Sequence, residues 1–228
     1  MSDAAALASF EAEVTACRAC PRLVEWRETV AREKRAAFRH EEYWGRPIPG
    51  FGDPAARVLV LGLAPAAHGG NRTGRIFTGD RSGDFLFAGL YRAGFANQPT
   101  SVHRDDGLEL RDCFITAAVR CAPPANKPLP EERERCAGWL ERELDLIATP
   151  RVVVCLGAFA WDAALRIPAL ADGPPPRPRP RFGHGAEYGR LLGCFHPSQQ
   201  NTFTGKLTPA MLDDVLVRAR ALAEEPFA

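Results

Sequence analysis

The chain has 228 residues, of which 46% are hydrophobic and 25% charged, and its formal net charge at pH 7 is +1. This is the composition of a soluble globular protein, and so small a charge neither requires nor excludes nucleic acid as a partner. No apolar run is long enough to span a bilayer and no signal peptide is evident, so we expect a cytoplasmic protein that does not contact a membrane.

Helical and strand-like segments alternate along the chain. Apolar residues at helical spacing predict helices over residues 3–16, 23–38, 84–93, 131–147, 159–165 and 208–224. Short aliphatic runs predict strands over residues 57–61, 113–121, 152–156 and 191–195. This alternation predicts a mainly parallel sheet that helices cover on both faces. Since we find no repeat and no convincing linker, residues 1–228 are expected to form one domain.

A glycine-rich stretch at residues 62–84, GLAPAAHGGNRTGRIFTGDRSGD, links the first predicted strand to the next helix. Glycine lets a backbone turn sharply and approach a ligand closely. Parallel α/β folds bind ligands at the carboxyl ends of their strands, and loops of this length are usually functional. We therefore expect a ligand site here, although the stretch matches neither a Walker loop nor the dinucleotide-binding fingerprint.

The seven cysteines fall into two groups by their surroundings. Three lie in apolar strand runs and are expected to be small buried hydrophobic residues: Cys113, Cys155 and Cys194. The other four are flanked by loop, charge or helix: Cys17, Cys20, Cys121 and Cys136. Disulfides are uncommon in the cytosol, so this second group predicts a metal site. Its spacing alone leaves zinc and an iron–sulfur cluster both open.

The segment at residues 171–181, ADGPPPRPRPR, combines prolines with three arginines. Proline excludes a helix or a central strand, so this segment is predicted to be a loop. A solvated surface loop and a basic loop that faces DNA are both compatible with the composition.

Three motifs together resemble the uracil-DNA glycosylase superfamily, and within it the iron–sulfur type-b branch (family five): GLAPAAHGGNRTGRIFTGD, FITAAVRCAPPANKP and HPSQQNTFTGKLT. The resemblance covers nearly the whole chain and implies a three-layer α/β/α sandwich around a mainly parallel four-stranded sheet. It implies a structural [4Fe–4S] cluster held by Cys17, Cys20, Cys121 and Cys136. It also implies a monomeric repair enzyme, associated with the nucleoid through DNA. Such an enzyme flips uracil out of double- or single-stranded DNA and excises it, leaving an abasic site.

The chemistry of base excision suggests roles for residues near these motifs. Phe77 is similar to the family's phenylalanine that stacks on the flipped base; the alternative is an ordinary core phenylalanine. His196, where the last strand ends, is suited to donate a hydrogen bond to the departing base anion. Leu63 and Ala64 stand where related enzymes carry an acid or amide that positions water. We therefore expect Asp80 to stabilise the sugar cation or orient water, the alternative being that it only caps the next helix.

The base pocket is expected to be permissive. Related enzymes read the edge of uracil with an asparagine in the second strand, where this chain has Ala117. A site that lacks this buried amide leaves fewer hydrogen-bonding groups unpaired when another base is bound. Hypoxanthine is therefore an expected substrate as well. Asn126 is the remaining amide near the pocket. Ala64, His68 and Gly69 complete the residues assigned to it.

Contacts to the DNA backbone need donors and cations rather than base-reading groups. The first and third motifs supply the candidates: Asn71, Arg72, Arg75, Ser198, Gln199, Gln200, Asn201, Thr204, Gly205 and Lys206. Gln200 occupies the position of a wedge that is more often apolar in relatives. Two rival functions remain open at this point: an iron–sulfur electron-transfer protein, and a DNA-damage binder that has lost catalysis.

Overall fold

The computed structural model describes residues 3–225; Met1, Ser2 and residues 226–228 lie outside the described part. Its sheet has six strands in the order β1-β3-β2-β4-β6-β5. The four central strands run parallel to one another: β3 (Cys113–Ala117), β2 (Val58–Gly62), β4 (Val152–Leu156) and β6 (Leu191–Cys194). The prediction of a mainly parallel sheet is therefore confirmed.

The predicted number of four strands is too small, because a two-residue antiparallel strand extends each edge of the sheet. β1 (Phe51–Gly52) pairs with β3, and β5 (Glu187–Tyr188) pairs with β6. Two residues are too few to show the alternation of apolar and polar side chains by which a strand is recognised. These edge strands therefore could not be predicted from the pattern.

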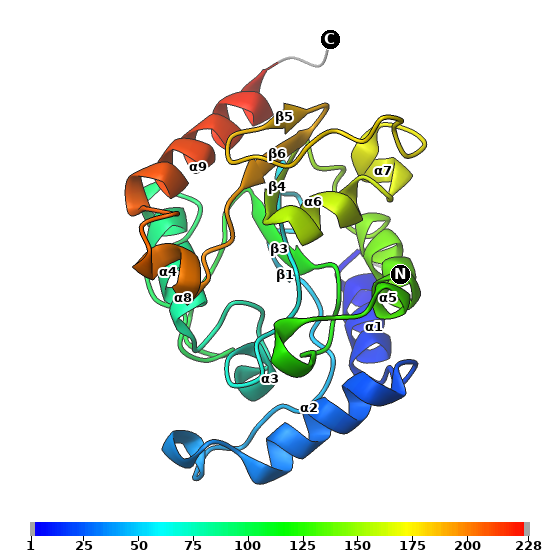
Figure 1. Ribbon diagram of the computed structural model, residues 1–228, viewed down its shortest axis with the longest axis vertical. Helices are drawn as coiled ribbons and strands as arrows, with labels where there is room; N and C mark the ends of the chain where they lie inside the picture. The colour runs from blue at the N-terminus through cyan, green and yellow to red at the C-terminus, as the bar shows by residue number, and fades with distance from the viewer. Residues whose placement is uncertain (1–2, 226–228) are drawn as a thin grey trace.

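Helices cover both faces of the sheet (Figure 1). One face carries α4 (Arg81–Arg92) and α9 (Pro209–Glu224), and the other carries α5 (Pro130–Leu144), α6 (Ala158–Ala164) and α7 (Pro168–Ala171). Successive side chains of a strand point to opposite faces. In β2, Val58 and Val60 accordingly join the core under α4 and α9, whereas Leu59 and Leu61 join the core under α5 and α6. This arrangement is the expected three-layer α/β/α sandwich.

The N-terminal helices α1 (Asp3–Thr15) and α2 (Pro21–Glu33) lie outside this sandwich, where α1 contacts α5 and α2 contacts α3. α2 is shorter than predicted, because the backbone of Lys34 turns to a φ of 56° and only the 3-10 turn η1 (Ala36–Phe38) follows. Three further short elements lie in loops: α3 (Gly70–Thr73), η2 (Pro124–Asn126) and α8 (Gln199–Phe203). None of the described helices is both long and apolar enough to cross a membrane.

The parallel centre of the sheet decides where the three motifs meet. Strands that run in the same direction place their following segments at the same edge. The glycine-rich stretch follows β2, residues 118–128 follow β3, and the segment that begins at His196 follows β6. All three segments therefore reach one edge of the sheet, as the lower half of Figure 1 shows around α3 and α8.

Candidate active site

A cavity of about 520 Å³ lies where the segments after β2, β3 and β6 meet. This volume is within the range of pockets that bind small molecules. Ala64, Phe77 and Asp80 line it from the glycine-rich stretch, Asn126 lines it from η2, and His196 and the start of α8 close it. The structure thus brings both predicted catalytic residues into one cavity.

Phe77 is held in an unusual conformation beside this cavity. Only 7% of its surface is exposed, and its φ of 51° lies in the left-handed region. Residues other than glycine adopt such a backbone at a cost of about 1–3 kcal/mol, and strain of this kind tends to mark functional sites. Its ring lies so close to Gly62 that a Cβ added there would come within 2.8 Å of it, and its centroid is 6.0 Å from that of His196. The ring belongs to the core and also faces the cavity.

Asp80 caps α4, as one of the two alternatives predicted, and it also lines the cavity. Its Oδ1 accepts hydrogen bonds from the backbone N–H groups of Ser82 (2.9 Å) and Gly83 (3.0 Å). Its Oδ2 accepts no hydrogen bond from residues 3–225 and lies so close to Gly69 that a Cβ added there would be 1.9 Å away. Burial raises the pKa of this carboxyl, and the two N–H groups oppose that shift. One oxygen thus caps α4 while the other remains available.

His196 follows β6 and is neutral at pH 7, because burial lowers the pKa of its imidazole to about 4. A neutral imidazole carries one N–H donor and one acceptor nitrogen. The backbone carbonyl of His196 accepts a hydrogen bond from Nδ2 of Asn201 (2.9 Å), which ties the histidine to α8. Burial thus disfavours the imidazolium cation, and the neutral ring can donate one hydrogen bond.

The other residues predicted for the pocket are placed differently. Ala64 and Asn126 line the cavity, and Asn126 is exposed. Ala117 is buried at the end of β3, in the same core cluster as Phe77, and does not line the cavity itself. His68 is also outside the lining, because its Nδ1 is hydrogen-bonded to the hydroxyl of Tyr43 at 3.0 Å.

Helix α8 forms one wall of the cavity through Ser198, Gln199 and Gln200. Ser198 caps this helix, since its Oγ accepts a hydrogen bond from the backbone N–H of Asn201 (3.4 Å). Directly after the helix, three of the residues predicted to bind DNA are exposed: Thr204, Gly205 and Lys206. The third motif therefore supplies both a pocket wall and an accessible surface beside it.

The three residues predicted to bind DNA from within the glycine-rich stretch are buried instead: Asn71 is 0%, Arg72 9% and Arg75 4% exposed. Arg72 donates to the carbonyl of Gly79 at 2.8 Å, and Arg75 pairs with the carboxylate of Asp106 at 2.7 Å. The placement of these residues does not support the predicted backbone contacts, because their donors are engaged inside the protein. They brace the stretch that carries Asp80.

The second group of cysteines also meets in one place. All seven cysteines are free, and a small cavity between α2 and α5 is lined by four of them: Cys17, Cys20, Cys121 and Cys136. Burial raises the pKa of Cys121 to about 11 and that of Cys136 to about 12. The other three cysteines, Cys113, Cys155 and Cys194, are fully buried in strands, as the sequence predicts.

Arg27 is a functional candidate that our sequence reasoning missed. Its side chain is 2% exposed, Nη1 donates to Sγ of Cys121 at 2.9 Å, and Nη2 donates to the carbonyl of Cys17 at 3.0 Å. The nearest carboxylate oxygen, on Glu28, is 3.9 Å away and is shared with Arg18. A signal was present in the sequence, because Arg27 stands four residues after Leu23 on the apolar face of α2.

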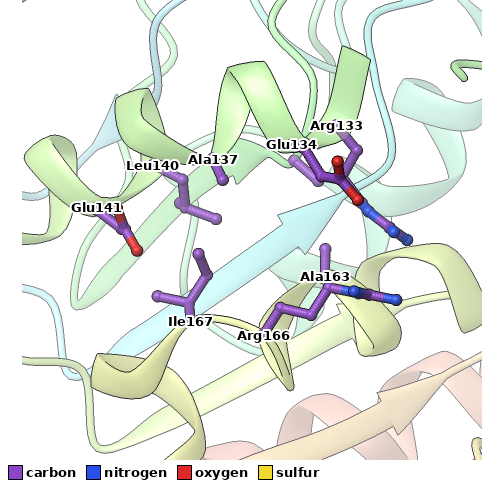
Figure 2. A pocket seen from close by; sticks show the side chains of 9 residues that line it. Arg133, Glu134, Ala137, Leu140, Glu141, Ala163, Arg166 and Ile167 are labelled. Atoms are coloured by element: carbon purple, nitrogen blue, oxygen red, sulfur yellow. The ribbon is translucent and has the colours of Figure 1, made fainter. Parts of the chain in front are cut away.

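A second cavity, of about 220 Å³, lies between α5 and α6. Figure 2 shows that Arg133 and Arg166 reach one end of it, while Leu140 and Ile167 line its interior. Both arginines donate to the carboxylate of Asp162, at 2.7 and 3.2 Å, so their charge is already compensated. None of the residues predicted for catalysis, base binding or metal binding lines this cavity.

The chain is similar to known proteins over most of its length. Residues 49–220 match the Uracil DNA glycosylase superfamily. The chain is 57% identical over 226 residues to the Type-5 uracil-DNA glycosylase of Mycobacterium bovis, which covers 96% of this chain and 83% of that relative. It is 54% identical over 220 residues to the Type-5 uracil-DNA glycosylase of Thermus thermophilus, covering 94% of this chain and 97% of the relative. The Type-4 uracil-DNA glycosylase of Archaeoglobus fulgidus is 35% identical over 114 residues, covering 50% of this chain and 49% of the relative. The chain belongs to the uracil-DNA glycosylase superfamily, whose members are DNA glycosylases that hydrolyse N-glycosidic bonds.

Proposed function

We propose that this chain excises uracil from DNA and also accepts deaminated purines such as hypoxanthine. The observation that carries the proposal is the cavity in which a carboxylate, a neutral imidazole and an aromatic ring meet: Asp80, His196 and Phe77. A glycosylase must hold an extruded base, stabilise a cationic sugar and accept a departing base anion. These three side chains match those three tasks.

In the reaction, the bond between C1′ of the sugar and the base nitrogen breaks and its electron pair leaves with the base. The N–H of the neutral His196 donates to an oxygen of the departing base, and Phe77 stacks on the base plane. The carboxylate of Asp80 stabilises the positive charge that develops on the sugar, or it orients the water that adds to C1′. Glycosidic bond hydrolysis commonly uses a carboxylate against an oxocarbenium-like sugar. The added water loses a proton to solvent, and an abasic site remains.

The end of β3 lacks a group that would restrict the substrate range to uracil. Ala117 stands at the end of this strand and supplies no amide, and Asn126 is an exposed residue of a flanking turn. A buried amide rejects a wrong base because its own hydrogen bonds are then left unmade. In a pocket without a buried amide, a base with a different pattern of donors and acceptors on its edge leaves few hydrogen bonds unmade. This supports hypoxanthine as a second substrate.

Contacts to the DNA backbone are assigned to α8 and the residues after it. Ser198, Gln199 and Gln200 border the cavity, and Thr204 and Lys206 are exposed beside it. We leave Asn71, Arg72 and Arg75 out of this surface, because they are buried.

The four-cysteine cavity is proposed to hold a structural [4Fe–4S] cluster, with Cys17, Cys20, Cys121 and Cys136 as ligands. The guanidinium of Arg27 supports an anionic group there, because a buried cation is costly unless a negative group compensates it. Within residues 3–225, no three His, Cys, Asp or Glu side chains converge closely enough for a single metal ion. Four cysteine thiolates are a ligand set that a [4Fe–4S] cluster takes. A bound cluster would join α2 to the segment after β3.

A single assay tests the activity. The purified protein is incubated with oligonucleotides that carry one uracil or one hypoxanthine, and abasic sites are then cleaved with alkali. Cleavage of both supports the proposal. Cleavage of uracil alone, with discrimination beyond about a thousandfold, refutes the permissive pocket. Binding of the oligonucleotide without any cleavage indicates a DNA-damage binder and refutes the proposal that the chain excises the base.

A further inference from the structure

Phe203, at the end of α8, is an unusually exposed aromatic residue. Its exposed fraction is 67%, larger than that of any other large hydrophobic side chain in the described part of the chain. The same helix starts at Gln199, which lines the active-site cavity. Four residues of α-helix span only about 6 Å, so the ring lies close to the mouth of the cavity. Single exposed apolar residues are common on protein surfaces, and what distinguishes this ring is its place beside the cavity.

The helix that carries this ring is firmly held. Asn201 donates through Nδ2 to the carbonyl of His196 (2.9 Å), and its own carbonyl accepts from the N–H of Leu207 (3.0 Å). Ser198 caps the start of the helix. A ring on a fixed helix loses little conformational freedom when it contacts a partner, which favours binding. Phe203 is thus exposed without belonging to a loose loop.

Arg81 lies over one face of this ring. Its guanidinium carbon is 5.3 Å from the ring centroid, and Phe203 is still 67% exposed. Arg81 directly follows Asp80, so the pair joins the two elements that border the cavity, the start of α4 and the end of α8. An aromatic face supported by arginine is the surface on which nucleic-acid bases stack. Proteins also insert apolar side chains between base steps when they distort a duplex.

We propose that Phe203, supported by Arg81, stacks on a DNA base beside the position that the excised nucleotide vacates. The inference rests on the proposed function, since DNA is the occupant. Extruding a nucleotide breaks its stacking, and that cost is smaller for a base that is already unpaired. The stacked ring replaces part of the lost contact. Phe203 therefore acts as a positioning residue, whose contribution grows with the amount of pairing that must be broken.

The test compares Phe203→Ala with Val217→Ala, a matched change at an exposed residue (63%) of α9 that is away from the cavity. Single-turnover rates are measured on uracil paired with adenine in a duplex and on uracil in a single strand. One stacked base is worth about 1–3 kcal/mol. Phe203→Ala should therefore slow the duplex reaction about tenfold, and the single-strand reaction less than about threefold.

Phe203→Trp should restore the duplex rate, because an indole also stacks, and Val217→Ala should change neither rate. Thermal unfolding should be unaltered in Phe203→Ala, since the ring is exposed. If Phe203→Ala slows the duplex and single-strand reactions equally, or slows neither more than Val217→Ala does, the inference is overturned. The exposed ring would then be a contact for a protein partner. If wild type releases no uracil from either substrate, the proposed function fails instead. Binding of a duplex with a non-hydrolysable uracil nucleotide then still decides about Phe203, because Phe203→Ala should weaken it by a similar factor.

Discussion

Replacing Asp80 with asparagine separates the two roles that the structure combines in this residue. Asparagine is as good an N-cap as aspartate, and its oxygen can keep both hydrogen bonds from Ser82 and Gly83. The substitution therefore removes the charge and leaves the cap. Burial raises the pKa of the Asp80 carboxyl, which means that the folded protein disfavours the charged form. Asp80→Asn should accordingly be as stable as wild type at pH 7, or more stable.

The expected loss of activity is much larger. Two unit charges about 4 Å apart interact by about 4 kcal/mol at an effective dielectric constant of about 20. If this energy acts on the sugar cation in the transition state, removing the charge slows the reaction about a thousandfold. The slowing should be the same for uracil and hypoxanthine, because the sugar is the same for both. Asp80→Ala removes the cap as well and should also cost about 1 kcal/mol of stability.

Single-turnover kinetics on both substrates, together with urea unfolding, measure these effects. The raised pKa adds a pH test. As the pH falls, the Asp80 carboxylate of wild type becomes protonated at a pH above the ordinary aspartate pKa of 3.8, and the rate should fall as the charged form is lost. Asp80→Asn should lack this acid limb. A rate within a fewfold of wild type for Asp80→Asn would show that Asp80 only caps the helix, and the catalytic role would have to be given up.

Five further outcomes are expected. His196→Ala should slow uracil release about a hundred- to a thousandfold, as the loss of one oxyanion donor does, and hypoxanthine release less; equal losses would mean that the residue only shapes the pocket. The pKa of His196 is about 4, so single-turnover rates should show no step from its titration between about pH 5 and 8. Ala117→Asn should narrow the preference towards uracil or, because the site is buried, lose activity; an unchanged substrate ratio with full activity would contradict the argument. Gly69→Ala should slow both substrates without weakening DNA binding, because the new Cβ displaces Asp80, and an unaltered rate would contradict this. Cys17→Ser should abolish the brown colour and visible absorption of the purified protein while Cys113→Ser keeps them; a colourless wild type with stoichiometric zinc after anaerobic purification would refute the cluster.

Local patterns in the sequence were enough to predict much of this molecule. The aliphatic runs of β2, β4 and β6 are buried on both faces and therefore read as continuous apolar segments. Alternation with helices then implied a parallel sheet, and a parallel sheet implied that the motifs after its strands share one edge. The separation of the cysteines into two groups followed from their neighbours in the sequence. Each of these inferences depends on residues that are near one another in the chain.

Other features depended on contacts between distant segments, and only the tertiary structure decided them. The sequence presents Arg75 as a free cation, but Asp106 pairs with it inside the protein. The sequence context of Asp80 left a helix cap and a catalytic group as alternatives. The structure shows that one carboxylate oxygen caps the helix while the other lies against Gly69. The position of Arg27 on the apolar face of α2 did not reveal its partner, which is Cys121, 94 residues away. Burial and the identity of a distant partner set the charge and exposure of a side chain, and neither is encoded within a few residues of it.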